Sequence, residues 1–270
     1  MNQKSLSHKI AEFCIQVEKS AKLIKEYVAQ FQNLQNRVLK ISLDSIYENM
    51  RKALLRFEDN IKVIYDVARA YGKLADRFAL IMIEMDWPPP MDIYPDQMIK
   101  IVEEYDQFGV EKIRAKVNKF LINFYNEKIL NEKLISWKNK GWIKKRIPIL
   151  EAAIKAHIEG KYILSVPTIL PQIEGIIADG YGHRGRMDGG QLKLYINSLL
   201  SGGNTKTFDK VIRNFFVDTL LAKFEYGSPV KSSLSRHAII HGADVHYGNV
   251  ANSLKTILLF DYLQGSFSLV

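Results

Sequence analysis

The sequence has a single cysteine, Cys14, and no long apolar run. One cysteine cannot form an intramolecular disulfide or supply a multi-cysteine metal cluster. The longest wholly apolar stretch, Phe78 to Ile83, has six residues, far below the roughly 18 that span a membrane. The first residues also lack the apolar core of a secretory signal. We therefore expect a cytoplasmic protein without a transmembrane segment, in which Cys14 is a core residue.

Acidic residues are too few to balance the basic ones. The chain has 38 Lys and Arg against 29 Asp and Glu, which gives a formal net charge of +9 and a pI near 9.3. The excess is spread over both halves of the chain, so there is no basic tail. This balance favours an anionic partner, of which nucleic acid is the commonest.

Apolar residues in the first half recur every three or four positions, as they do along one face of a helix. One stripe runs from Ile10 to Ile41 and a second from Ile46 to Ile81, with Ser42 as an N-cap between them. The second stripe stops at the prolines of positions 88–90, because proline lacks an amide and disfavours helix before it. A helix at 95–107 and a longer one at 110–140 follow. The pattern predicts either a long helical hairpin for dimerisation or partner binding, or a bundle of four amphipathic helices.

The second half is also helical, with expected helices at 147–159, 162–178, 191–200, 208–224, 234–241 and 250–263. Pro167 and Pro171 should kink the second of these helices or lie in its first turns. No stretch alternates as a strand does. The sequence therefore predicts an all-α protein with a helical N-terminal region at 1–141 and a second helical domain at 142–270.

Arg236 and His241 enclose four residues in a segment that holds three of the six histidines. On a regular helix His237 and His241 share a face, whereas Arg236 lies about 140° from His241. One helix cannot easily turn both groups onto one substrate atom, so either the arginine wraps round or a second copy of the chain completes the site. An arginine paired with a carboxylate, beside histidines favoured at a helix end, would give the same pattern without chemistry.

Residues 146–263 resemble the HEPN superfamily (higher eukaryotes and prokaryotes nucleotide-binding), small helical bundles with a terminal Arg-x4-6-His motif. The first 140 residues take no part in the resemblance. The matching pieces are Arg146-Ile-Pro-Ile-Leu-Glu151, Ala156-His-Ile-Glu-Gly160, Ser165-Val-Pro167, Leu170-Pro-Gln-Ile-Glu-Gly175, Arg236-His-Ala-Ile-Ile-His241, Asn252-Ser-Leu-Lys255 and Leu258-Leu-Phe-Asp-Tyr262.

The resemblance implies a metal-independent endoribonuclease that acts as a homodimer with facing motif helices, in a toxin or an antiviral-defence effector. It implies Arg236 and His241 as the catalytic pair, His237 as the polar neighbour and Glu174 as an acidic position on the second helix. RNA is then the substrate, an antitoxin or defence-complex subunit is a further partner, and neither a cofactor nor a metal is needed. Ala243 stands where members paired with a nucleotidyltransferase antitoxin have a tyrosine, so we do not predict that mode of regulation.

The residue types suit this chemistry. Attack by the ribose 2′-hydroxyl needs a base, an acid and a cation at the phosphate. Histidine transfers protons near neutral pH, and arginine holds phosphoryl oxygens while keeping its charge. The glycine-rich basic loop with His183, Arg184 and Arg186 could hold backbone phosphates or stack a base, and Tyr247 is a further candidate RNA-binding residue. For the loop, an exposed, mobile insertion is the alternative.

Two other functions remain open. A metal hydrolase could use His237 and His241, which have ligand spacing, with Asp244 and His246 nearby, although no glutamate follows His237 and Gly242 should end the helix. A non-catalytic helical interaction module would keep the motif for structure alone. Loss of RNA cleavage in variants of Arg236 and His241 that still fold and dimerise would separate catalysis from interaction.

Overall fold

The computed structural model describes residues 18–30, 43–200 and 207–267. These residues are mainly helical and contain no strand, which confirms the all-α prediction. The chain divides into two compact units, Asn2–Lys73 and, apart from Met1, Leu74–Val270. Cys14, Ser42 and most of the stripe from Ile10 to Ile41 lie outside the described residues.

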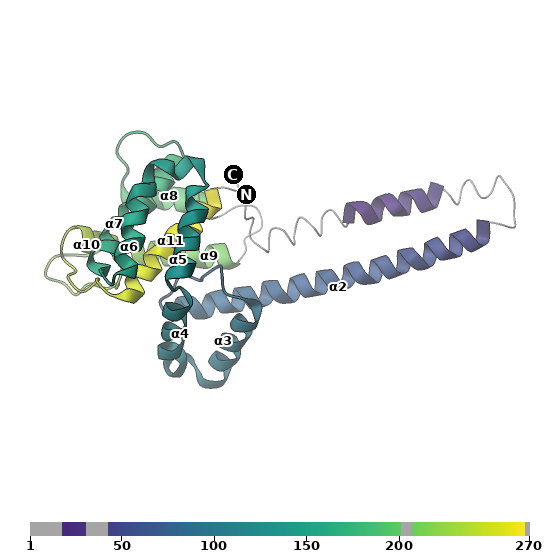
Figure 1. Cartoon of the computed structure of the whole chain (residues 1–270), viewed down its shortest axis with the longest axis horizontal. Helices are drawn as coiled ribbons and strands as arrows, with labels where there is room; N and C mark the ends of the chain where they lie inside the picture. Colours follow the sequence, from purple (N-terminus) through teal and green to yellow (C-terminus); the bar gives the residue numbers. More distant parts are fainter. Residues whose placement is uncertain (1–17, 31–42, 201–206, 268–270) are drawn as a thin grey trace. The chain divides into compact units, whose positions relative to one another are not determined.

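The Asn2–Lys73 unit is helical over residues 18–30 and over the first part of α2 (Leu43–Glu84) (Figure 1). Along α2 in this unit, half-buried side chains recur every three or four residues, which is the spacing of one helix face. These side chains are Leu54, Phe57, Ile61, Ile64, Ala68 and Tyr71. The second helix expected from the sequence is therefore confirmed, while its role in dimerisation or partner binding stays a prediction.

The Leu74–Val270 unit begins with the last turns of α2, which end before the prolines at 88–90 as predicted. Helix α3 (Pro95–Phe108) follows, but the single helix expected at 110–140 is wrong. Two helices, α4 (Val110–Phe124) and α5 (Glu127–Lys138), occupy that stretch. The side chain of Asn126 accepts hydrogen bonds from the backbone amides of Lys128 and Ile129 and so starts α5 as an N-cap.

The core of this unit is built from α6 (Ile147–Ile158), α7 (Tyr162–Gly180) and α11 (Val250–Phe267). Helix α7 packs against both α6 and α11, and Figure 1 shows the three helices side by side. The short 3₁₀ helix η1 (Gly141–Arg146) leads into α6. Helix α8 (Gly189–Leu199), helix α9 (Thr207–Phe215) and the π-helical turn η2 (Phe216–Leu220) connect α7 to the motif helix, so the expected helix at 208–224 ends early.

Both prolines lie inside α7, Pro167 as its sixth residue and Pro171 as its tenth. Proline has no amide hydrogen, so Pro167 cannot bond to the carbonyl of Ile163 four residues earlier. The hydroxyl of Tyr247 donates to that carbonyl oxygen at 3.3 Å instead. This replaces the lost helical bond and attaches the segment after the motif to the start of α7.

The boundary expected at residues 141 and 142 falls inside the Leu74–Val270 unit. Helix α5 is held to α11 by buried polar groups: Lys133 Nζ lies 2.6 Å from Asp261 Oδ2, and Trp137 Nε1 donates to Asp261 Oδ1 at 2.6 Å. The Trp137 ring also packs edge-on against Phe260. These contacts join α5 to the C-terminal helices, so the unit begins well before Gly141.

A buried histidine in α6 predicts how stability depends on pH. His157 is 8% exposed, and its Nδ1 lies 2.7 Å from Ser253 Oγ. Burial lowers the pKa of His157 from 6.5 to about 4. In the unfolded chain this imidazole is protonated below about pH 6.5, whereas in the folded chain it is protonated only below about pH 4. Acidification therefore favours the unfolded chain, and we expect the free energy of unfolding to fall by about 3 kcal/mol between pH 7 and pH 4 through this group.

Urea unfolding of the wild type and of His157→Gln at both pH values measures this contribution. The variant should lose about 3 kcal/mol less on acidification than the wild type, while His246→Gln, a change at an exposed histidine, should behave like the wild type. Equal losses in all three proteins would contradict the assignment.

Candidate active site

The motif lies on α10 (Arg236–Ile240), a helix shorter than the sequence suggested. Ser235 caps it: its Oγ accepts from the amide of Ala238 and donates to the carbonyl of Ala222. Gly242 ends it with a φ of +76°, a conformation that glycine adopts without strain. His241 is therefore the first residue beyond the helix, at its C-terminal end.

Arg236 is held by Glu174 of α7. Its Nη2 donates to Glu174 Oε2 at 2.7 Å, and its Nε lies 2.6 Å from Oε1. Both side chains are about one-fifth exposed. The pair occupies one edge of the guanidinium, and Nη1 makes no bond to another described residue. Burial raises the pKa of Glu174, and the arginine opposes this only in part.

The rings of His237 on α10 and of His241 just beyond its end lie side by side, as their spacing predicted. Their ring centroids are 6.2 Å apart and the ring planes are within 2° of parallel. His237 is half-buried and His241 is exposed. Burial, followed by the nearby charges of Arg236 and His241, lowers the pKa of His237. The imidazole of His237 is thus mainly neutral near pH 7 and able to accept a proton.

Two aromatic residues that the sequence did not single out surround His241. The hydroxyl of Tyr226 donates to the carbonyl oxygen of His241 at 2.7 Å, and the Phe224 ring centroid is 6.2 Å from the His241 ring. Tyr226 is 72% exposed. Both residues lie in the loop after η2, and no local pattern connects them with the motif.

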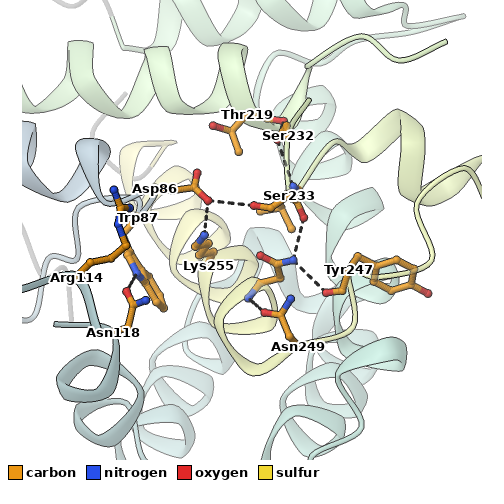
Figure 2. A network of polar contacts seen from close by, with 12 residues as sticks. Asp86, Trp87, Arg114, Asn118, Thr219, Ser232, Ser233, Tyr247, Asn249 and Lys255 are labelled. Carbon is orange, nitrogen blue, oxygen red and sulfur yellow. Dashed lines mark hydrogen bonds and ion pairs between the residues drawn. The ribbon is translucent and has the colours of Figure 1, made fainter. Parts of the chain in front are cut away.

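The backbone on both sides of α10 is fixed by a polar network that includes α11 (Figure 2). Asn252 Nδ2 donates to the carbonyls of Ser233 and Tyr247, which lie before and after the motif. Ser233 Oγ donates to Asp86 Oδ2, which also accepts from Lys255 Nζ. The sequence pointed to Asn252 and Lys255 only as parts of a resemblance and gave no sign of Asp86.

The candidate RNA-binding residues do not form one surface. His183, Arg184 and Arg186 follow the C-terminal end of α7, where His183 Nδ1 lies 2.9 Å from the Tyr195 hydroxyl and both arginines are exposed. Tyr247 is bonded near the other end of α7, at Ile163. About 27 Å of helix, at 1.5 Å per residue, separates the two places. The bond of Tyr247 to α7 favours a role in holding the motif segment.

The described residues contain no group of three or more His, Cys, Asp or Glu side chains arranged to hold a metal ion. Asp244 instead accepts a hydrogen bond from the backbone amide of His246. The geometry therefore gives no support to the metal-hydrolase alternative at His237, His241, Asp244 and His246.

Among the described residues, no helix has the length and apolar character needed to cross a membrane. Comparison of the chain with protein-family models, with curated proteins and with solved structures found no match. The arrangement of Arg236, His237, His241 and Glu174 is therefore the basis on which a function is proposed.

Proposed function

We propose that the chain is a metal-independent endoribonuclease whose site combines the Arg236 and His241 groups of two copies. The observation that carries the proposal is the presentation of the motif. Helix α10 leaves His241 exposed and His237 half-buried beside it, while Arg236 is fixed against Glu174. A proton-transfer group at the surface and a cation held in place nearby are what cleavage of a phosphodiester requires.

In the proposed reaction, one imidazole takes the proton of the ribose 2′-hydroxyl while its oxygen attacks phosphorus. The bond from phosphorus to the 5′-oxygen breaks, an imidazolium protonates the departing oxygen, and a 2′,3′-cyclic phosphate remains. The lowered pKa of His237 keeps its imidazole neutral, so it can accept a proton during this step. Nη1 of Arg236, which the Glu174 pair leaves free, is the guanidinium atom that would bind a phosphoryl oxygen.

Two copies are invoked because positions 236 and 241 are about 140° apart around a regular helix, so one copy does not easily turn both groups onto one phosphate. A second copy of α10 facing the first would add another imidazole and another guanidinium to the same phosphate. Exposed apolar side chains next to the motif support such a contact: Ile240 is 42% exposed and Val245 is 72% exposed. Burial of these two side chains between the copies would favour the contact.

We assign this activity to a toxin or an antiviral-defence effector that acts in the cytoplasm, with an antitoxin or a defence-complex subunit as a further partner. The resemblance of residues 146–263 to the HEPN superfamily is the support for this assignment.

The second candidate is a non-catalytic helical interaction module. The observation in its favour is the ion pair between Arg236 and Glu174, because a structural arginine would make the same contact. This module would leave RNA intact, so an assay of cleavage separates the two candidates.

The test uses a single-stranded DNA oligonucleotide with one ribonucleotide, incubated with the full chain in excess chelator. We expect one cut, on the 3′ side of the ribonucleotide, and no cut in the all-deoxy strand, because the attacking hydroxyl is then missing. Cleavage of the all-deoxy strand would contradict the proposal. Activity that is lost in chelator and restored by a divalent metal would also contradict it, and would favour the metal-hydrolase alternative.

A further inference from the structure

One side chain of α11 joins the two ends of the motif segment. Asn252 Nδ2 donates to the carbonyl oxygen of Ser233 at 2.8 Å and to that of Tyr247 at 3.1 Å. These carbonyls are 14 residues apart and enclose the whole of α10 and the turn after it. Asn252 is 3% exposed, so water has little access to replace its bonds.

The chemistry of this clamp requires an amide. Both hydrogens of one NH₂ group are used, each on a backbone carbonyl that belongs to neither α10 nor α11. Aspartate has the same shape but places one carboxylate oxygen, which cannot donate, against both carbonyls, and serine has a single donor. Asn252 is not the N-cap of α11. Asn249 is, because its Oδ1 accepts a hydrogen bond from the backbone amide of Asn252 at 2.9 Å.

The Ser233 end of the segment has a second attachment. Ser233 Oγ donates to Asp86 Oδ2 at 3.0 Å, and the same oxygen lies 2.6 Å from Lys255 Nζ (Figure 2). Asp86 has a φ of +63°, a strained backbone for a residue other than glycine. Lys255 is 5% exposed and lies over the Trp87 ring. Asn252 thus fastens the motif segment to a part of the unit that is itself fixed.

We propose that Asn252 is a positioning residue of the candidate active site, which holds the segment from Ser233 to Tyr247 closed so that Arg236 and His241 keep one geometry. The inference rests on the proposed ribonuclease function for its effect on catalysis. The clamp acts through the backbone and does not touch the substrate. A displacement of about 1 Å at a reacting group can lower a rate by about 100-fold, so its loss should reduce kcat and leave KM almost unchanged.

The variant Asn252→Asp tests the clamp, and Asn249→Ala is the matched control because it removes the helix cap and leaves both clamp bonds in place. We expect kcat for RNA cleavage to fall by about 100-fold in Asn252→Asp and to stay near the wild-type value in Asn249→Ala. Where Asn252→Asp fails to fold, Asn252→Ser takes its place, since it keeps a small polar side chain with one donor.

A second readout does not depend on activity. In the full chain, Asn252→Asp should speed hydrogen exchange of the amides of residues 238–244 and shift the ring signals of His237 and His241, while exchange of the buried amides of Leu259 and Phe260 stays slow. Wild-type exchange and ring signals in a folded Asn252→Asp variant would overturn the clamp. So would equal changes in Asn249→Ala, since the effect would then belong to the start of α11.

The two readouts keep the inference distinct from the function on which it rests. A wild-type chain that leaves RNA uncut, together with faster exchange of the motif segment in Asn252→Asp, would overturn the ribonuclease and support the clamp. Normal cleavage by a folded Asn252→Asp variant would overturn the positioning role and support the ribonuclease.

Discussion

Replacement of His241 by alanine should lower kcat/KM for RNA cleavage by about 10²–10⁴-fold, the range over which general acid–base groups contribute. The loss is expected because His241 is the exposed imidazole of the motif. The hydroxyl of Tyr226 donates to the backbone carbonyl of His241 and not to its ring. Removal of the exposed ring should therefore leave the fold unaffected. Steady-state cleavage of a fluorogenic RNA and thermal unfolding measure the two effects.

His246→Ala is the matched control, because it removes an exposed imidazole from the same loop, five residues away. It should cleave RNA at the wild-type rate. A His241→Ala variant that keeps its activity, or a His246→Ala variant that loses as much, would show that the motif histidine is not the proton-transfer group. Arg236→Ala is a less clean test, because it leaves the partly buried Glu174 without its ion-pair partner and so affects stability as well.

Replacement of Lys133 by methionine should lower the free energy of unfolding by about 3–5 kcal/mol, as loss of one partner from a buried ion pair does. Lys133 is 7% exposed, and its Nζ lies 2.6 Å from Asp261 and 2.5 Å from Asp92. Burial alone would lower the pKa of the lysine, but the two carboxylates outweigh burial and raise it. Without the lysine, the carboxylates of Asp92 and Asp261 lose the cation that pairs with both of them.

Urea unfolding of the full chain measures this loss, with Lys128→Met as the control. Lys128 is an exposed lysine of the same helix, and its replacement should change stability by no more than about 0.5 kcal/mol. A Lys133→Met variant as stable as Lys128→Met would contradict the account of how α5 is attached to α11.

Helix positions followed from the sequence wherever apolar periodicity and a strong terminator occurred together. The end of α2 before the prolines and the end of α10 at Gly242 are examples. Periodicity failed at Asn126, where the apolar stripe continues across the break and the capping side chain is the only sign of it. Periodicity also has no bearing on the pairing of Lys133 with Asp261, which joins residues 128 positions apart across the boundary expected at 141 and 142.

For the candidate site, too, local features could be predicted from the sequence and contacts between distant segments could not. The Arg236 and His241 spacing located the motif, and the helical angle correctly anticipated that His237 and His241 share a face. Tyr226, Asp86 and the bonds of Asn252 could not be foreseen, because each contact depends on where distant segments fold. The spread of His183 and Tyr247 to opposite ends of α7 has the same cause.

Mass spectrometry of the fragments made from a short single-stranded RNA in excess chelator identifies the chemical groups at the cut ends, and these show which oxygen attacked phosphorus. If paired guanidinium and imidazole groups drive attack by the neighbouring ribose oxygen, the upstream fragment carries a 2′,3′-cyclic phosphate and the downstream fragment a 5′-hydroxyl. Fragments that end in a 3′-hydroxyl and begin with a 5′-phosphate would contradict the account, since an external water would then have been the nucleophile.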